Sequence, residues 1–267
     1  MELTKESSML KGKAALVTGS SGGIGLAIAQ SLAAAGCHVV LHGLEDKSLV
    51  ADKLEEMRAH GVDVAYHQMN LQDPSETQQL ATLAIEQFGR IDVLVNNAVT
   101  RHFSPIDHFP TERWDQALAV NLSAPFHLVR ALLPLMRETG WGRIINMTSV
   151  YGSRGTPNRI DYVTTKSALI GMTRAIASEI VGTEITCNAL CPGSVLTPNI
   201  ESRIRALMQE KKLDWDTATK EFLQGKQPGG KLIPAQDLAQ LALFLCTGAG
   251  GQMNGVILPM DNGWMAL

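Results

Sequence analysis

The sequence has few cysteines and no long hydrophobic run. It contains four cysteines in 267 residues, and the closest two, Cys187 and Cys191, lack the CxxC spacing of metal or redox sites. We therefore expect buried thiols in a reducing compartment. No uninterrupted apolar run reaches the roughly 18 residues of a membrane span, and the first ten residues lack the apolar core of a signal peptide. These absences predict a cytoplasmic protein that does not enter a membrane.

Charge of either sign is not in excess. Lys and Arg number 23 against 26 Asp and Glu, for a formal net charge of -3, and the two signs are interleaved along the chain. Nucleic acids and anionic membranes attract proteins with a strong basic excess, so we expect neither as a partner. No cluster of His, Asp or Glu has metal-ligand spacing, so no metal is expected. A small molecule is the expected substrate.

Short apolar runs alternate with helix-length segments along most of the chain. This alternation is typical of a parallel sheet with helices on both faces. The pattern predicts the α/β class, with a doubly wound domain of the Rossmann type and a seven-stranded parallel sheet. The expected strands are residues 14–18, 38–42, 62–68, 92–96, 143–147, 185–190 and 255–260, and the first three helices are residues 24–36, 48–60 and 74–89.

One core is enough for a chain of this length and composition, in which 45% of the residues are hydrophobic. We expect a flexible leader over residues 1–9 and one catalytic domain over residues 10–267. Residues 198–226 interrupt the alternation, because two amphipathic helices follow each other with no strand between them. Ligands bind beyond the carboxyl ends of parallel strands, so this insertion is expected to act as a small helical lid.

The stretch TGSSGGIG, Thr18 to Gly25, follows the first strand and opens the first helix. Its glycines, Gly19, Gly23 and Gly25, leave backbone N–H groups free to approach a phosphate, and the helix N-terminus favours negative charge. In this position between a strand and a helix, the loop predicts dinucleotide binding and not merely a tight turn.

The stretch DYVTTK places Tyr162 and Lys166 four residues apart, on the same face of a helix. A free phenol titrates near pH 10, so it acts as a base near neutral pH only if its anion is stabilised by roughly 4 kcal/mol. A nearby ammonium group supplies such stabilisation. The pair alone is also typical of an ordinary helix, and its context favours the catalytic interpretation.

The spacing TGxxxGxG, the NNA of residues 96–98 and the YxxxK of residues 162–166 occur in the order found in the short-chain dehydrogenase/reductase family. The chain resembles this family over residues 10–267. The resemblance implies hydride transfer between a secondary alcohol and a nicotinamide, and a homotetramer paired through an apolar edge of the helix that carries Tyr162. The implied catalytic residues are Ser149, Tyr162, Lys166 and Asn121. The implied cofactor-binding residues are Gly19, Ser21, Gly23, Ile24, Gly25, Asn97, Ala98, Tyr162, Lys166, Pro192, Gly193 and Thr197.

The surroundings of Asn121 add a local argument. Pro125 has no N–H group, so the carbonyl of Asn121, four residues earlier, loses its helical hydrogen-bond partner. A carbonyl freed in this way can bind a water molecule.

Cofactor choice is set after the second strand, where an acidic side chain binds a ribose hydroxyl and a basic one pairs with a 2′-phosphate. The sequence there is LHGLED, residues 41–46, which contains no Arg or Lys. NAD is therefore favoured over NADP, by the absence of a phosphate partner and not by an aspartate at the strand end.

Within the family, the chain is most similar to the bacterial D-3-hydroxybutyrate dehydrogenases, in segments such as FPTERWD, CPGSVLTP and EFLQGKQP. The resemblance implies NAD and a 3-hydroxybutyrate-like hydroxy acid. Guanidinium groups favour planar anions, and a family relative that acts on a hydroxypropyl thioether sulfonate also uses two arginines. A larger alcohol that bears a sulfonate or a second carboxylate is the alternative, and a non-catalytic nucleotide sensor is another. The implied substrate-binding residues are Arg101, Ser149, Tyr151, Arg159 and Arg203.

Overall fold

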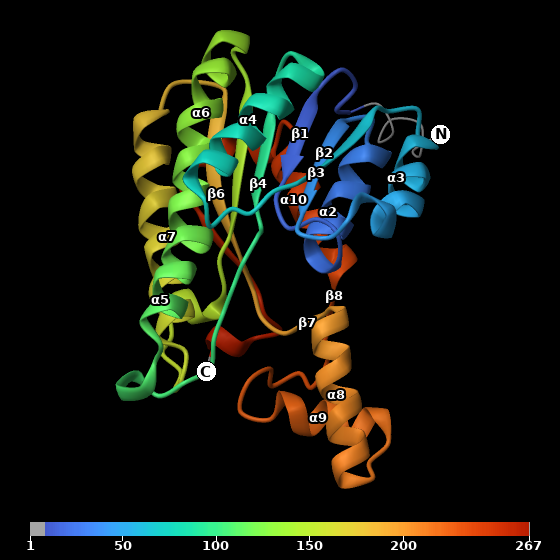
Figure 1. The fold of residues 1–267 in the computed structure, drawn as a ribbon, viewed down its shortest axis with the longest axis vertical. Coiled ribbons are helices and arrows are strands. Elements are labelled where there is room, and N and C mark those ends of the chain that lie inside the picture. The colour runs from blue at the N-terminus through green and yellow to red at the C-terminus, as the bar shows by residue number, and fades with distance from the viewer. Residues whose placement is uncertain (1–8, 267) are drawn as a thin grey trace.

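The structure, a computed structural model, describes residues 9–266 (Figure 1). Seven parallel strands form one sheet in the order β3-β2-β1-β4-β5-β6-β9, which confirms the predicted sheet. The strand order reverses where β1 lies next to β4, and parallel sheets bind ligands at such a point. The strands are β1 (Ala14–Val17), β2 (His38–Gly43), β3 (Val64–Gln68), β4 (Val93–Asn96), β5 (Gly142–Met147), β6 (Ile185–Pro192) and β9 (Ile257–Met260).

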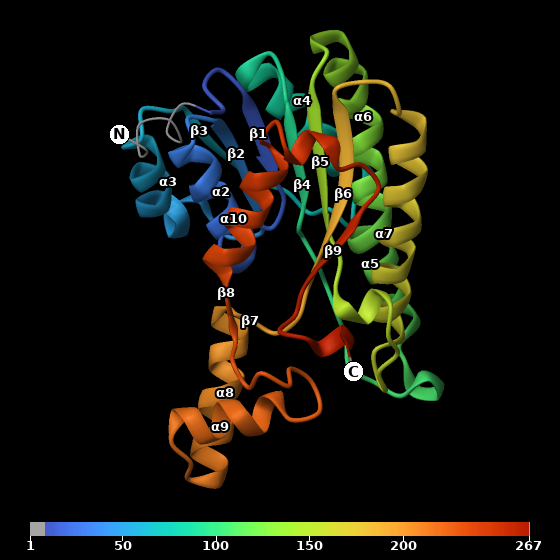
Figure 2. The same cartoon turned by 180° about the vertical axis from the view of Figure 1, so that it is seen from behind.

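Helices cover both faces of the sheet, as Figures 1 and 2 show from opposite sides. One face packs against α2 (Gly23–Ala34), α3 (Ala51–Arg58) and α10 (Ala235–Leu245). The other packs against α4 (Pro74–Phe88), α6 (Ala124–Thr139) and α7 (Ile160–Glu179), and α5 (Thr111–Leu118) contacts α7. The predicted leader, residues 1–9, lies outside the described residues except for Met9, which packs against the α2 side of the core.

The sequence of β1 is a continuous apolar run, and its packing explains why. Ala15 and Val17 pack into the cluster on the α2 side, whereas Ala14 and Leu16 pack into the cluster on the α4 side. Successive side chains of a strand point to opposite faces. Because both faces are covered, every position of β1 is buried and apolar.

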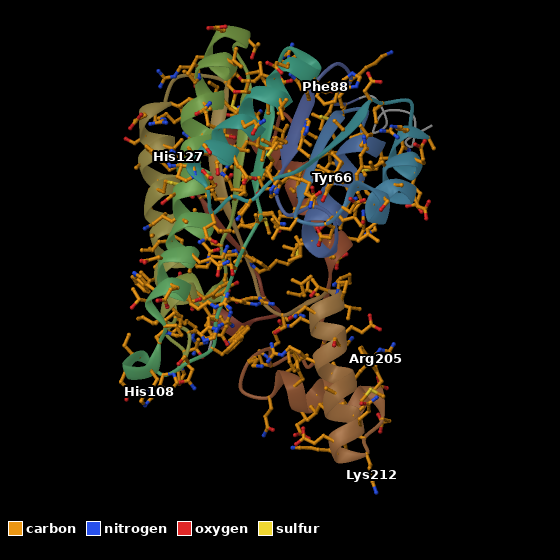
Figure 3. All side chains as sticks on the ribbon, viewed as in Figure 1. Tyr66, Phe88, His108, His127, Arg205 and Lys212 are labelled. Carbon is orange, nitrogen blue, oxygen red and sulfur yellow. The ribbon has the colours of Figure 1, made fainter. Side chains whose placement is uncertain are left out.

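The predicted pair of helices at residues 198–226 is present as α8 (Pro198–Lys211) and α9 (Trp215–Leu223). They extend beyond the carboxyl ends of the strands, and Lys212 lies at the far tip (Figure 3). A short ribbon of two parallel strands, β7 (Val195–Leu196) and β8 (Ile233–Pro234), joins this α8–α9 segment to the rest of the molecule. The ribbon was not predicted, because two residues per strand are too few to show a period.

The helical stretch Thr111–Thr139 has a mean hydropathy of 1.3 over an 18-residue window, which meets the length and composition of a membrane span. This stretch was not predicted from the sequence, because charged residues interrupt it. Its apolar side chains Leu128, Leu132 and Met136 are buried in the core cluster beneath the sheet. Of that 18-residue window, 33% is buried inside the structure.

The four cysteines are buried and free, as expected. Burial raises the pKa of Cys187 to about 12, and it raises the pKa of Cys191 to about 11. Thiols with raised pKa values form little of the reactive thiolate near neutral pH.

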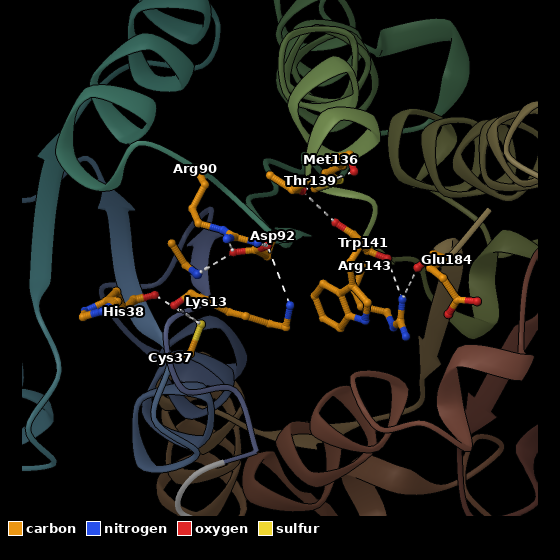
Figure 4. A network of polar contacts seen from close by, with 12 residues as sticks. Lys13, Cys37, His38, Arg90, Asp92, Met136, Thr139, Trp141, Arg143 and Glu184 are labelled. Carbon is orange, nitrogen blue, oxygen red and sulfur yellow. Dashed lines mark hydrogen bonds and ion pairs between the residues drawn. The ribbon is translucent and has the colours of Figure 1, made fainter.

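A polar network ties the amino ends of the strands together (Figure 4). The fully buried carboxylate of Asp92 accepts hydrogen bonds from the Ala14 N–H at 2.9 Å and from Arg90 Nε at 2.8 Å. The Trp141 ring lies under two cations, with Lys13 Nζ at 3.8 Å and Arg143 Cζ at 4.3 Å from its centroid. This network lies at the end of the sheet opposite to the glycine-rich loop.

Candidate active site

The loop between β1 and α2 approaches the residues after β4 so closely that only glycine fits at two positions. A Cβ on Gly19 would lie 2.8 Å from the Ala98 Cα, and a Cβ on Gly25 would lie 2.4 Å from the Gly19 carbonyl oxygen. Gly19 also has a φ of 61°, in the left-handed region. The loop therefore presents backbone at the N-terminus of α2, which suits the pyrophosphate of a dinucleotide.

Thr18 and Asn97 fasten this loop to β4. The Thr18 hydroxyl accepts the N–H groups of Asn97 and Ala98, both at 3.0 Å. The Asn97 amide donates in return to the carbonyls of Thr18 at 3.0 Å and Gly19 at 2.8 Å. The predicted cofactor residues Gly19, Asn97 and Ala98 are thus brought together by hydrogen bonds.

His42, to which the sequence assigned no role, supports the same loop from β2. Its Nδ1 accepts the Gly19 N–H at 3.1 Å, and its Nε2 lies 3.0 Å from the Met69 carbonyl. This arrangement requires the neutral imidazole with its proton on Nε2. Burial, above all, lowers the pKa of His42, so the neutral form is favoured. The only sequence signal was a histidine at a buried strand position.

A carboxylate lies beside the glycine-rich loop where the second strand ends. Glu45 Oε2 accepts the Leu44 N–H at 3.1 Å, and a hydrogen bond with Ser21, above all, lowers the pKa of Glu45. Lys53 Nζ donates to the Ser21 carbonyl at 2.6 Å. No cation was predicted at this turn, because Lys53 comes from α3, eight residues beyond Glu45. The two loops bracket the position of an adenosine ribose in such folds.

Tyr162 and Lys166 lie on the first turns of α7, as predicted. The Lys166 Nζ is 5.7 Å from the centroid of the Tyr162 ring and donates to the Met147 carbonyl, at the end of β5, at 2.5 Å. Both residues are buried. Burial, with a smaller contribution from Arg101, lowers the pKa of Lys166 to about 7.

Ser149 and Asn121 come from two other parts of the fold. Ser149 follows β5 and its hydroxyl accepts the Tyr151 N–H at 3.2 Å. Asn121 belongs to a π-helix, Ala119–Ser123, between α5 and α6. Its amide group donates to the Thr100 carbonyl at 2.9 Å and to the Thr165 hydroxyl at 3.2 Å. Asn121 is therefore hydrogen-bonded to the residue preceding Lys166.

A cavity of about 470 Å³ opens at the carboxyl ends of the strands, between the sheet and the α8–α9 segment. It brings together most of the predicted site residues, whereas Ser21, Gly23, Gly25, Asn121 and Lys166 do not line it. The predicted residues that line it are Gly19, Ile24, Asn97, Ala98, Arg101, Ser149, Tyr151, Arg159, Tyr162, Pro192, Gly193, Thr197 and Arg203.

The cavity also has residues that the sequence analysis missed. Lys226 adds a fourth cation to the three predicted arginines, and Phe103, Phe222 and Trp264 add aromatic surface. Lys226 and Phe222 belong to the segment EFLQGKQP, so that the resemblance of this segment was their only signal. Phe103 was not predicted, because it lies in an irregular stretch after β4, where no period marks a side chain as facing a cavity.

These features define a nicotinamide-binding oxidoreductase with a buried Ser, Tyr and Lys beside its cofactor loop. Residues 13–207 match the family model described as short chain dehydrogenase, and the chain belongs to this family. It is 40% identical over 259 residues to a D-beta-hydroxybutyrate dehydrogenase of Cupriavidus necator, covering 97% of this chain and 100% of that one. A D-beta-hydroxybutyrate dehydrogenase of Rhizobium meliloti is 37% identical over 257 residues, with 95% and 99% coverage. The L-sorbose reductase of Gluconobacter frateurii, solved with NADPH and L-sorbose, is 28% identical with a TM-score of 0.91 and 98% and 99% coverage.

The neutral state of His42 predicts a pH dependence of stability. Because its pKa is lowered in the folded protein, the unfolded chain, titrating near pH 6.5, binds the proton first as the pH falls. The free energy of unfolding should therefore be highest above about pH 6.5 and decrease below it, toward the folded pKa. In His42→Gln this decrease should be shallower, as measured by urea unfolding in steps from about pH 7.5 to pH 5.

The control for this experiment is His108→Gln, because the His108 side chain is 79% exposed. It should reproduce the pH dependence of the wild type. His67, whose pKa burial also lowers, stays in both variants, so a residual decrease is expected. If His42→Gln and the wild type lose stability in parallel, His42 does not govern the acid response.

Proposed function

We propose that the protein is an NAD-dependent dehydrogenase that interconverts the alcohol and ketone forms of an anionic hydroxy acid resembling 3-hydroxybutyrate. One observation carries this proposal: Ser149 and Tyr162 line the same cavity as the glycine-rich loop and a group of cationic side chains. The named activity of the two bacterial relatives supports it.

The cavity residues divide into those that hold the cofactor and those that act on the substrate. The loop around Gly19, Gly23 and Gly25 suits the pyrophosphate, and Pro192, Gly193 and Thr197 would border the nicotinamide, which accepts the hydride from the alcohol carbon when it is bound. The Ser149 hydroxyl hydrogen-bonds the substrate oxygen. The Tyr162 phenol takes the proton of the alcohol, or returns it in the reverse direction.

Lys166 holds the positive charge that stabilises the phenolate. Since its pKa is lowered to about 7, it can also release a proton near neutral pH and pass it toward solvent. Asn121 is a positioning residue, because both ends of its side-chain amide are bound, to Thr100 and to Thr165. Its backbone carbonyl, which has no α-helical donor because Pro125 lacks an N–H group, can bind a water molecule that accepts this proton.

The function is tested by adding NAD and D-3-hydroxybutyrate and following the absorbance of the reduced nicotinamide. Tyr162→Phe should lower kcat by about 10³-fold, because it removes the general base. Its affinity for NAD, measured by isothermal titration calorimetry, should remain close to that of the wild type, since the ring is kept. Binding of NAD without any reduction, by the wild type and over a wide set of hydroxy acids, would instead identify a nucleotide sensor.

The preference for NAD rests on Glu45. A carboxylate beside Ser21 can accept a hydrogen bond from an adenosine ribose hydroxyl, whereas it repels a 2′-phosphate. The hydrogen bond with Ser21 lowers the pKa of Glu45, so the side chain is charged at neutral pH. The L-sorbose reductase neighbour was solved with NADPH, and cofactor choice must therefore be argued from the residues of this chain.

Glu45→Ala should reduce the preference for NAD. We expect the ratio of kcat/KM with NAD to kcat/KM with NADP to fall by roughly tenfold or more, because the repulsion is removed and Lys53 becomes available to a 2′-phosphate. The matched control is Glu55→Ala on α3, a 70% exposed carboxylate paired with Arg58, which should leave the ratio unchanged. An unaltered ratio in Glu45→Ala would assign the preference to another residue.

The homotetramer expected from the sequence is part of the proposal. An apolar groove of about 350 Å³ runs between α6 and α7 and is lined by Phe126, Val129, Leu133, Met172 and Ile176, among others. The Phe126 side chain is 49% exposed, and an exposed apolar groove of this kind is typical of a subunit contact.

Sedimentation equilibrium tests this assembly. The wild type should sediment with the mass of four chains, and Met172→Asp should dissociate it, because a charge in an apolar contact is costly. Val181→Asp, at a 75% exposed apolar residue just after α7, is the control and should remain assembled. A wild type that sediments as a monomer would contradict the proposal.

A further inference from the structure

The cavity carries more positive charge than one carboxylate needs. Four cations line it: Arg101, Arg159, Arg203 and Lys226. Among the described residues that line the cavity, none is Asp or Glu. Like charges in a partly buried space repel one another, and this repulsion, second to burial, lowers the pKa of Lys226 through Arg203 and Arg159. A ligand that carries negative charge would reduce this repulsion.

Arg159 lies next to the reacting groups. Its guanidinium carbon is 4.2 Å from the centroid of the Tyr162 ring and 4.7 Å from that of Phe103. Its Nε and Nη2 atoms are buried and have no hydrogen-bond partner among the described residues. These two atoms share one edge of the guanidinium, which is the edge that binds a carboxylate in bidentate fashion. Arg159 alone can therefore bind one carboxylate beside Tyr162.

Arg203, on α8, and Lys226, just after α9, are the cations that the α8–α9 segment brings to the cavity, and Arg203 Cζ also lies 5.9 Å from the centroid of the Phe103 ring that Arg159 contacts. Both lie over the ring of Phe222, with Arg203 Cζ at 5.0 Å and Lys226 Nζ at 4.2 Å from its centroid. The fourth cation, Arg101, donates to Asn199 Oδ1 at 2.9 Å. Neither Arg203 nor Lys226 has an ion pair in the described part of the chain.

We propose that the substrate carries two anionic groups: a carboxylate held by Arg159 near the reacting carbon, and a second anion at the far end of the molecule held by Arg203 and Lys226. The proposal rests on the proposed function and makes it more specific. The substrate class is a 3-hydroxy acid with a distal carboxylate, or a sulfonate or phosphonate in its place. A monocarboxylate such as 3-hydroxybutyrate occupies only the Arg159 side.

The first test compares substrates that differ in the distal charge alone. 3-Hydroxyadipate and 3-hydroxypimelate are each assayed with NAD against their distal monoamides, and 3-hydroxybutyrate is the monoanionic reference. At least one diacid should exceed its monoamide by about tenfold or more in kcat/KM, mainly through a lower KM, because a distal charge is then paired. Equal kcat/KM values for every acid and its amide would overturn the proposal.

Substitutions of single cations test which of them bind the distal charge. Arg203→Met and Lys226→Met should each lower kcat/KM for the diacid by at least about fivefold more than kcat/KM for 3-hydroxybutyrate, because only the diacid carries a distal charge. Arg205→Met is the matched control, because Arg205 lies on the same helix, pairs with Glu201 and is 62% exposed. Equal losses on both substrates in Arg203→Met would contradict a distal anion site.

A binding experiment separates this proposal from the proposed function. Glutarate and butyrate, which have no hydroxyl group to oxidise, are titrated into the protein with NAD while the fluorescence of its tryptophans, including Trp264 in the cavity wall, is followed. Glutarate should bind at least about tenfold more tightly than butyrate, and Arg203→Met should abolish the difference. This outcome would support the dianion site even if no hydroxy acid were oxidised. A weaker affinity for NAD in Arg203→Met would instead assign Arg203 to the cofactor phosphates and overturn the proposal.

Discussion

The close contact between the glycine-rich loop and the end of β4 is the constraint on which the site depends. Sheet order reverses between β1 and β4, so the connections from these two strands leave toward opposite faces and a crevice opens between them. The Thr18 hydroxyl and the Asn97 amide keep this crevice narrow by bonding the two loops to each other. A side chain larger than hydrogen at Gly25 would collide with the Gly19 carbonyl. The geometry that suits a dinucleotide therefore follows from two glycines and two polar side chains.

The pair Tyr162 and Lys166 depends on a second constraint, which is burial. Lys166 is 2% exposed, and removing an ammonium group from water favours its neutral form. The Met147 carbonyl offsets part of this cost by accepting a hydrogen bond. A phenolate on Tyr162 would offset more, because opposite charges in a desolvated site attract strongly.

The features that could be predicted from the sequence are those with a period or a fixed spacing. Ala14 to Val17 alternate between two buried faces and read as a strand, and Tyr162 and Lys166 fall on one helical face at a spacing of four. Features that depend on residues distant in the sequence could not be predicted. His42 contacts Gly19 across two strands, and Lys53 reaches Ser21 from another helix. The π-helix at Ala119–Ser123 was foreshadowed only by Pro125, which removes one α-helical hydrogen bond without indicating how the backbone adapts.

The cations at the two ends of the sheet have different partners, and this difference indicates which end binds a ligand. At the amino ends, Lys13 and Arg143 lie over the Trp141 ring, and the chain also supplies the buried carboxylate of Asp92 to Arg90 and Lys13. At the carboxyl ends, Arg159 and Lys226 again lie over aromatic rings, but no carboxylate lines the described cavity. An aromatic face stabilises a nearby cation by only about 0.5–2 kcal/mol. This is less than the free energy that is lost when one member of a buried ion pair is left without its partner. If the cavity cations served the fold alone, we would expect an acidic residue among them, as at Asp92. Among the described residues that line the cavity these cations have no acidic partner, which is the property of a site that receives its negative charge from outside.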